Sequence, residues 1–420
     1  MGKKPLQTGN QYHKPYRPLP IALFNRAGRV AEKMGVLGQL DTEQLIANAR
    51  RKSGLTDFGD EWFRTPLSVL VNAINEEANL TPLGKLIQKN RLEAALMVRL
   101  RAQQLLQAHP EILQIDLGKI IIIAGLQRTG TTTLHRLLAA DPNMRALLSW
   151  EALNPLPLPR EKTGNPKKRI AMARTAEKGL AYLAPEFFAI HPVEHDAPEE
   201  DVLLLDLSFM SQSPEATLHV PTYANWLEKQ DHTPAYEYLR TLLKILTWQR
   251  PAANWVLKTP HHMEYLDVIL KVFPEATIVQ THRDPQKTTG SFCSMVAHGR
   301  GVFSDQVDAR DVARHWVRKV NRLMQVSIDV RERANPQRFI DVSYYDLLKD
   351  PIAEVARIYR AAGLPFDERV AQAAEATRQR NVQHRYGKHV YRLEDFGLTR
   401  EDIETQTAFY RRRYGIPYEQ

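Results

Sequence analysis

The sequence predicts an α/β protein in which a P-loop-like central parallel sheet is flanked by helices and preceded by a helical region. Residues 119–123 (KIIII) form a short β-branched run, which is typical of a strand buried on both faces, as in parallel sheets. Further runs of this kind alternate with helical segments along the chain. Such alternation implies right-handed crossovers and therefore a parallel sheet.

The region before the sheet is expected to be mostly helical. In residues 83–113 (LGKLIQKNRLEAALMVRLRAQQLLQAHPEIL) the apolar residues recur at intervals of three and four, the spacing of an amphipathic helix. The polar, proline-bearing start of the chain reads as an extended arm. We therefore expect a helical N-terminal region with its arm (1–115), an α/β domain (116–370) and a C-terminal closing segment packed on that domain (371–420).

Four strands are expected, and polar clusters follow them. The strands lie in 119–123, 254–260, 276–285 and 338–351. Each is followed by a turn or a helix, as where leucines share one side of the segment 131–142 (TTTLHRLLAADP). Because ligands of parallel α/β sheets bind at the carboxyl ends of the strands, we expect the polar clusters there to form the functional site.

Composition narrows the class of protein. The chain has 420 residues, of which 43% are hydrophobic and 25% charged, and a formal net charge of +9. The positive charge suits an anionic ligand, but the basic residues are spread rather than clustered with aromatics, so no nucleic-acid partner is expected. Cys293 is the only cysteine, which excludes a disulfide within the chain and a thiolate metal cluster. No apolar run approaches the length of a membrane span, and we expect a cytoplasmic protein without stable membrane insertion.

The turn after 119–123 resembles an ATP-binding phosphate loop that lacks its lysine. Gly125 and Gly130 have the spacing of G-x-x-x-x-G-K-[ST], but Thr131 stands where the lysine belongs. A strand, a tight turn and a helix start gather backbone N–H groups around one point, where the helix dipole favours an anion. Arg128 supplies a charge that can bind in bidentate fashion, and the threonines add hydroxyl groups.

Three motifs together resemble those of sulfotransferases that use 3′-phosphoadenosine 5′-phosphosulfate (PAPS). Residues 128–134 (RTGTTTL) resemble the loop that binds the 5′-phosphosulfate. Arg283 and Ser291, eight residues apart, match the family's 3′-phosphate site, and Tyr344 begins a Y-x-D-L-x-x-x-P pattern that ends at Pro351. The motifs occur in the family's order, each after its own strand. The chain is most similar to the bacterial branch related to tyrosylprotein and carbohydrate sulfotransferases.

The resemblance implies an activity, a cofactor and a set of binding residues. The sulfonate of PAPS would pass in line, without a metal, to an acceptor hydroxyl, leaving 3′,5′-adenosine bisphosphate. In the closing segment of that branch, His389 and Tyr391 correspond to residues near the cofactor. The cofactor-binding residues it implies are Arg128, Thr129, Gly130, Thr131, Thr132, Thr133, Arg283, Ser291 and Tyr344.

Several residues compete for the catalytic roles. Lys258, at the end of the second expected strand, is a candidate electrophile, since it can neutralise charge on the transferring group. Glu151 and His262 are candidate bases, each at a spacing that departs from the family branches with a comparable residue. His195, with Glu199 and Glu200 in the dense titratable cluster 195–200, is the third candidate.

Two other functions remain open at this stage. A degenerate P-loop kinase or nucleoside triphosphatase would bind ATP with Mg²⁺, and the missing lysine together with Arg283 and Ser291 argues against it. A non-catalytic nucleotide-binding protein would keep the fold without turnover. The acceptor is expected to be a small molecule with a hydroxyl group, such as an apolar alcohol, sterol, phenol or lipid, and residues 150–250 are apolar enough to line its pocket.

Overall fold

The centre of the molecule is a sheet of parallel strands, as the sequence predicts. The computed structural model describes residues 6–7, 12–35, 38–162, 164–381 and 387–419. The five strands all run parallel, in the order β3-β4-β2-β5-β6. Four of them are the expected strands, and the fifth, β3, is a short edge strand that the sequence analysis missed. Their bounds are β2 (Lys119–Ile123), β3 (Met144–Ala146), β4 (Asn254–Lys258), β5 (Thr277–His282) and β6 (Phe339–Ser343).

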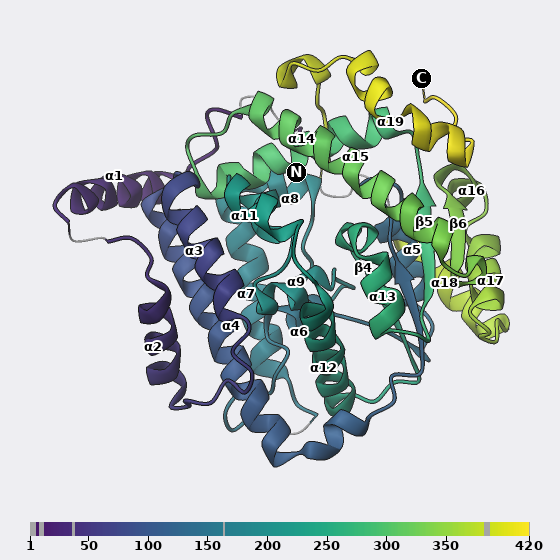
Figure 1. The fold of residues 1–420 in the computed structure, drawn as a ribbon, viewed down its shortest axis with the longest axis horizontal. Helices are drawn as coiled ribbons and strands as arrows, with labels where there is room; N and C mark the ends of the chain where they lie inside the picture. Colours follow the sequence, from purple (N-terminus) through teal and green to yellow (C-terminus); the bar gives the residue numbers. More distant parts are fainter. Residues whose placement is uncertain (1–5, 8–11, 36–37, 163, 382–386, 420) are drawn as a thin grey trace, which may run out of the picture.

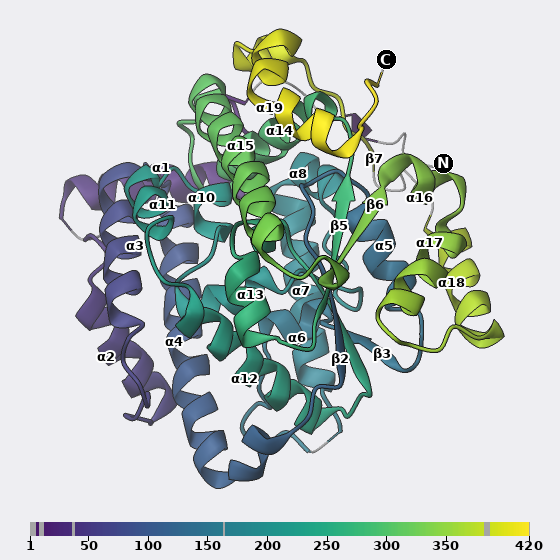
Figure 2. The same ribbon diagram turned by 45° about the vertical axis from the view of Figure 1, so that its right-hand side comes forward.

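The isoleucine run of β2 divides its side chains between two cores. Ile121 and Ile123 join a cluster with helices α5, α17 and α18, whereas Ile120 and Ile122 join a larger cluster with α12, α13 and α15. Figure 2 shows the two groups of helices on opposite sides of the strands. These helices are α5 (Thr131–Leu138), α12 (Thr233–Gln249), α13 (Leu266–Val272), α15 (Ala309–Arg333), α17 (Pro351–Ala361) and α18 (Glu368–Arg380).

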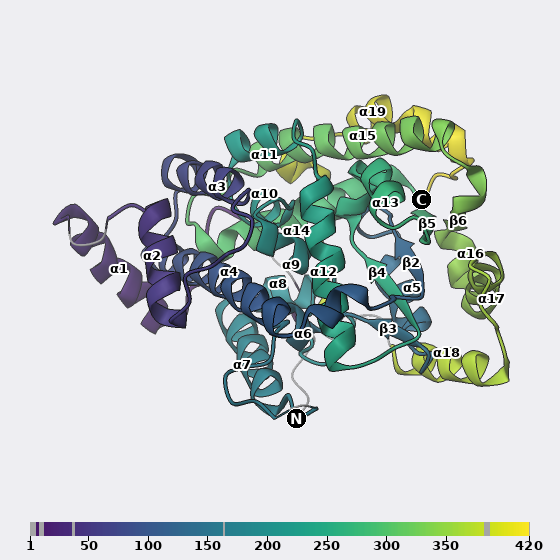
Figure 3. The ribbon, with the colours of Figure 1, turned by 60° about the horizontal axis from the view of Figure 1, so that its bottom comes forward.

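The region before the sheet is helical, as predicted, and shares the larger core. Leu67, Leu70 and Leu96 belong to the same buried cluster as Ile120, so no break in packing separates this region from the sheet. In Figures 1 and 3 these helices lie to the left of the strands. They are α1 (Leu19–Lys33), α2 (Thr42–Ser53), α3 (Arg64–Glu77), α4 (Pro82–Ala108) and the short η1 (Pro110–Gln114).

A run of helices, most of them short, lies between β3 and α12 and joins the sheet to the N-terminal helices. The backbone N–H of Lys258 at the end of β4 donates to Asp201 Oδ1 at 2.9 Å, which fixes the start of α9 against the sheet. This run comprises α6 (Ser149–Leu153), α7 (Lys167–Leu183), α8 (Pro185–Ile190), α9 (Val202–Leu205), η2 (Asp206–Ser208), α10 (Ser213–Thr217) and α11 (Pro221–Leu227).

Segments from the two ends of the chain meet beside α14. Strand β1 pairs in parallel with β7, Leu6 opposite Gly387, and α19 packs along α14 and α15 at the top of Figure 1. Residues 1–5 and 8–11 of the predicted arm lie outside the described residues. Among the described helices, none combines the length and the apolar character needed to cross a bilayer. The remaining elements are β1 (Leu6–Gln7), β7 (Gly387–Lys388), η3 (Pro260–Glu264), α14 (Pro285–Phe303), η4 (Pro336–Arg338), α16 (Tyr344–Lys349), η5 (Leu393–Phe396) and α19 (Arg400–Tyr414).

Candidate functional site

The turn from β2 into α5 is folded too tightly for ordinary side chains at two positions. Gly130 has φ of 87°, and a Cβ atom on Gly125 would lie 2.0 Å from Thr281 Oγ1, so both positions require glycine. The buried hydroxyl of Thr129 donates to the carbonyl oxygen of Leu126 at 2.6 Å and lies 2.6 Å from Thr281 Oγ1. The Thr129 side chain therefore supports the turn from beneath, and the structure does not bring it to the surface of the site.

A cleft of roughly 330 Å³ lies over this turn, where several strands end. Its walls include residues from the segments that follow β2, β4, β5 and β6, as expected for a parallel sheet. The structure therefore brings together groups from distant parts of the sequence. The predicted cofactor-binding residues among its walls are Arg128, Gly130, Thr131, Thr132, Thr133, Arg283 and Tyr344.

Arg128 is an unpaired cation in the wall of this cleft. No hydrogen bond or ion pair joins its guanidinium to another of the described residues. Its backbone lies in the left-handed region, with φ of 70°. Arg128 is exposed as a whole residue, yet the protein packed around the guanidinium and the charge of Arg283 lower its pKa. A cation that the protein leaves without a partner, beside the N-terminus of α5, is a ready anion-binding group.

Arg283, at the end of β5, is held from three sides. Its Nη1 donates to the backbone oxygen of Arg128 at 2.9 Å, and its guanidinium lies over the ring of Tyr344, 4.0 Å from the centroid. The remaining edge forms a bidentate pair with Glu419, with Nε to Oε1 at 2.6 Å and Nη2 to Oε2 at 2.8 Å. The Arg283 fork thus already binds a carboxylate in the geometry that it would use for phosphate oxygens.

The hydroxyl of Ser291 is engaged by the segment that follows β7. His389 Nδ1 lies 3.2 Å from Ser291 Oγ, and its Nε2 lies 3.0 Å from Ser294 Oγ. Burial and the charge of Arg128 lower the pKa of His389 to about 3, so its imidazole is neutral near pH 7. His389 itself lines the cleft. The ring of Tyr391 covers Gly290 of α14, the helix that also contains Ser291 and Ser294.

Lys258 and Glu200 form a second charged group at the end of β4. Lys258 is only 3% exposed, and its Nζ lies 2.5 Å from Glu200 Oε1. The other oxygen of Glu200 accepts a hydrogen bond from Thr259 Oγ1 at 3.3 Å. Glu200 lines the cleft, so the predicted cluster 195–200 reaches the site through this carboxylate.

None of the four predicted catalytic residues is among the lining residues of the cleft: Lys258 lies behind Glu200, and the other three have partners of their own. Glu151 is 1% exposed and pairs with Arg145 at 2.7 Å and with Arg250 at 3.1 Å. Each of the other two is held by a carboxylate: His262, fully buried, lies 2.9 Å from Asp201, whereas His195 Nδ1 lies 2.6 Å from Glu177 of α7. The structure therefore gives Glu151, His262 and His195 paired, supporting positions away from Arg128.

One residue in the wall of the cleft, Arg136, was not predicted from the sequence. Its guanidinium binds Glu194 at 2.7 Å and Asn381 at 2.8 Å. Arg136 follows Thr132 by four residues and Thr133 by three, so helical spacing places all three on one face of α5. That spacing is the signal that would have found Arg136.

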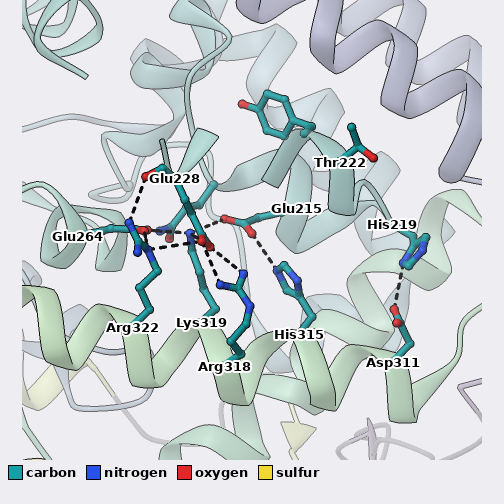
Figure 4. A network of polar contacts seen from close by, with 12 residues as sticks. Glu215, His219, Thr222, Glu228, Glu264, Asp311, His315, Arg318, Lys319 and Arg322 are labelled. Atoms are coloured by element: carbon teal, nitrogen blue, oxygen red, sulfur yellow. Dashed lines mark hydrogen bonds and ion pairs between the residues drawn. The ribbon is translucent and has the colours of Figure 1, made fainter. Parts of the chain in front are cut away.

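A buried ionic network holds the elements around η3 against α15. Lys319 is fully buried, and its Nζ lies 2.7 Å from Glu264, 3.0 Å from Glu228 and 3.5 Å from Glu215 (Figure 4). Burial alone would lower the pKa of Lys319, but the carboxylates outweigh it and the pKa is raised. Because Glu264 ends η3, which begins two residues after Lys258, the network helps to fix the end of β4.

The fold and the cleft together define an α/β protein with a P-loop-like turn and an arginine-lined cleft above it. Comparison with known proteins specifies this class further. The model of the sulfotransferase family matches residues 121–368, which is more than half of the chain. The chain therefore belongs to the sulfotransferase family, and the resemblance inferred from the sequence motifs is confirmed.

Individual relatives agree with the family. The crystal structure of sulfotransferase STF1 from Mycobacterium tuberculosis H37Rv is 33% identical and covers 88% of this chain and 99% of its own, with a TM-score of 0.78. That of sulfotransferase STF9 from Mycobacterium avium is 27% identical, covers 90% of this chain and 97% of its own, and has a TM-score of 0.81.

Curated relatives match over a shorter length. The omega-hydroxy-beta-dihydromenaquinone-9 sulfotransferases Stf3 of Mycobacterium bovis and Mycobacterium tuberculosis are each 26% identical over 259 residues. The match covers 58% of this chain and 62% of each relative.

Proposed function

We propose that the protein transfers the sulfonate of PAPS to the hydroxyl group of an apolar acceptor. One observation carries the proposal: Arg283 donates to the backbone of Arg128 at 2.9 Å, so the two predicted phosphate-binding groups adjoin in one cleft. A ligand with phosphate groups on both sides of a single ribose suits this arrangement. The family membership of the chain supports the same conclusion.

The residues of the cleft fit such a ligand. Arg128 has no partner among the described residues, and the exposed side chains of Thr132 and Thr133 stand beside it at the start of α5. We assign Arg128, the loop amides and these threonines to the 5′-phosphosulfate, and Arg283 with Ser291 to the 3′-phosphate. Bound PAPS would supply an activated sulfonate whose leaving group is the phosphate of 3′,5′-adenosine bisphosphate.

We propose Glu200 as the base that takes the proton of the acceptor hydroxyl. It is the carboxylate of the predicted titratable cluster that lines the cleft, and Lys258 lies 2.5 Å from it. A carboxylate beside the reacting groups can accept the proton, and the Lys258 ammonium can neutralise the charge that develops during transfer. Glu151, His262 and His195 are less suited, because their polar atoms already bind charged neighbours outside the cleft.

For the acceptor we propose a small apolar alcohol. The Stf3 relatives carry in their name a hydroxylated menaquinone derivative, which is an apolar molecule with a hydroxyl group. The short helices between β3 and α12 bring many apolar side chains, such as Leu203 and Leu207, close to Glu200 in the chain.

Two measurements test the proposed function. Calorimetric titration with 3′,5′-adenosine bisphosphate should give the same Kd with and without Mg²⁺, and ATP should bind much more weakly. Transfer of radiolabelled sulfonate from PAPS to a panel of alcohols should then proceed in the presence of EDTA. Tight binding of ATP that depends on Mg²⁺ would favour a kinase or nucleoside triphosphatase instead. Tight nucleotide binding without transfer to any acceptor would favour a non-catalytic binding protein.

A further inference from the structure

A second cavity, separate in its lining from the cleft, lies between α4 and the short helices that follow β3. Its volume is roughly 340 Å³, within the range of small-molecule pockets. The walls are mainly aliphatic and aromatic: Leu92 and Ala95 come from α4, Leu203 from α9, and Leu207 and Phe209 from η2 and the residue after it. An apolar hollow of this size removes apolar ligand surface from water, which favours binding.

One polar group in this cavity lacks a partner. Gln88 lines the cavity and is only 2% exposed, and its amide nitrogen Nε2 is buried without a hydrogen-bond partner among the described residues. Leaving a buried donor unsatisfied costs free energy that a ligand oxygen would recover. The Gln88 amide therefore indicates a ligand that carries a hydrogen-bond acceptor.

The charged groups at the edge of the cavity are already engaged. Arg91 pairs with Asp206, and Arg101 donates to the backbone oxygen of Pro157. Asp206 neutralises Arg91, Arg101 is held by a neutral carbonyl group, and the rest of the lining is mainly apolar, so the cavity suits an uncharged ligand.

The cavity begins one turn from the proposed base. The backbone N–H of Leu203, in the cavity wall, donates to the carbonyl oxygen of Glu200 at 3.3 Å. Helix α6 makes a second connection, because Ser149 binds Glu199 at 3.1 Å while Ala152 and Leu153 line the cavity. The wall of the cavity therefore begins about one helical turn, or ~5 Å along the chain, from Glu200.

We propose that this cavity, which we name the α4 cavity, binds the apolar portion of the acceptor alcohol. Gln88 Nε2 then donates to an oxygen of the acceptor that lies far from the reacting hydroxyl. The identification of the ligand as the acceptor rests on the proposed function. The inference gives the N-terminal helix α4 a role in substrate selection. The ligand class is a neutral, mainly aliphatic alcohol with a second oxygen.

Direct binding and transfer are measured on the same variants. Equilibrium dialysis gives the Kd of radiolabelled decan-1-ol and decane-1,10-diol, and labelled PAPS gives the KM of each alcohol. Ala95→Leu and Leu203→Phe reduce the hollow from opposite walls, Gln88→Leu removes the amide, and Ala108→Leu changes the exposed last residue of the same helix α4 as a control. The Kd for 3′,5′-adenosine bisphosphate and the thermal unfolding curve show that each variant is folded.

The expected results follow from the geometry. Affinity for primary alcohols from butan-1-ol upward should rise about fourfold per methylene until the cavity is full. Ala95→Leu or Leu203→Phe should raise both the Kd and the KM of decan-1-ol at least tenfold and leave the nucleotide Kd unchanged. Ala108→Leu should change none of these constants. Gln88→Leu should weaken the diol about three- to tenfold but not decan-1-ol.

Either of two results overturns the inference. The first is that decan-1-ol binds the folded Ala95→Leu and Leu203→Phe variants as tightly as the wild type. The second is that the Kd of decan-1-ol rises in these variants while its KM stays at the wild-type value. If decan-1-ol binds as expected and no sulfonate is transferred to any alcohol, the cavity stands as an apolar binding site and the proposed function fails.

Discussion

The carboxylate of Glu419 forms a bidentate ion pair with the guanidinium of Arg283, with N–O distances of 2.6 and 2.8 Å. Two further bonds hold Glu419 in place: its backbone N–H donates to Asp284 at 2.8 Å, and Tyr345 donates to its side chain at 3.1 Å. The same edge of Arg283 is the one that the proposed 3′-phosphate needs. Nucleotide binding must therefore exchange one anion for another at this position.

Replacing this carboxylate should strengthen nucleotide binding. In Glu419→Gln the 3′-phosphate no longer competes with a charged group, and since partly exposed ion pairs contribute at most about 1 kcal/mol, the Kd of 3′,5′-adenosine bisphosphate should fall about two- to fivefold. Isothermal titration calorimetry measures this change, with Glu401→Gln, an exposed position on α19, as the matched control. A Kd that rises in Glu419→Gln would show that Glu419 orients Arg283 rather than competing for it.

Arg128 should dominate binding of the 5′-phosphate. Arg128→Met removes an unpaired cation from the cleft and should raise the Kd of 3′,5′-adenosine bisphosphate roughly ten- to hundredfold, the usual range for a charge-assisted bidentate contact. Arg128→Lys should recover only part of this loss, because an ammonium cannot bind two oxygens in the same plane. The exposed Arg26→Met serves as a control, and an unchanged Kd in Arg128→Met would remove Arg128 from the site.

The choice of base is tested by paired amide substitutions. Glu200→Gln should lower kcat by roughly 10²- to 10⁴-fold with little change in the Kd of 3′,5′-adenosine bisphosphate. Glu199→Gln, at the neighbouring carboxylate that binds Ser149, should retain most of the activity. His195→Ala should also remain active, because His195 pairs with Glu177 outside the cleft. A fully active Glu200→Gln enzyme, or an inactive His195→Ala enzyme that binds nucleotide normally, contradicts the assignment.

Lys319 should be essential for stability rather than for chemistry. Lys319→Met leaves three carboxylates facing one another without their central cation, and breaking a buried charge cluster in this way typically costs about 3–5 kcal/mol. Urea unfolding followed by circular dichroism measures the loss. The control is Arg314→Met, at an exposed residue of the same helix, which should change the free energy of unfolding by less than about 1 kcal/mol. Equal stability of Lys319→Met and the wild type would contradict the role of the network.

The same network predicts how stability depends on pH. Burial alone would raise the pKa of Glu228, but Arg318 and Lys319 lower it from its usual 4.5 to about 2 in the folded protein. The unfolded chain then takes up the proton first, so the stabilisation is complete above about pH 4.5 and is lost as the pH falls toward 2. Urea unfolding at a series of pH values should show that acid lowers the free energy of unfolding less in Glu228→Gln than in the wild type. An identical slope in both proteins would exclude Glu228 as a source of the acid sensitivity.

Much of the fold was predictable because its signals are local. The isoleucine run 119–123 is β-branched and apolar at every position, and the structure uses both faces of it. The helical spacing of residues 83–113 likewise predicts α4. By contrast β3 is three residues long and contains Arg145, so neither its length nor its composition separates it from a loop.

The residues of the candidate site were predictable only where a single sequence motif contains the binding side chain. Arg283 stands directly after β5 and Arg128 lies in the turn that follows β2, and the topology of a parallel sheet brings such positions together. The partners of these residues were not predictable, since Glu419 reaches Arg283, and His389 reaches Ser291, through folding of distant segments. Sequence spacing also cannot show that Glu151 is held by two arginines, which is why several bases remained open.

The pairing of Leu6 with Gly387 has a consequence for how the enzyme is made. His389 follows this pairing by two residues, contacts Ser291 and lines the cleft, so this wall of the cleft forms only after residue 389 has been synthesised and has folded against α14. Contacts between such distant segments form slowly, because a long loop must close before they are gained. Competence to bind nucleotide should therefore be among the last properties that a newly synthesised chain acquires.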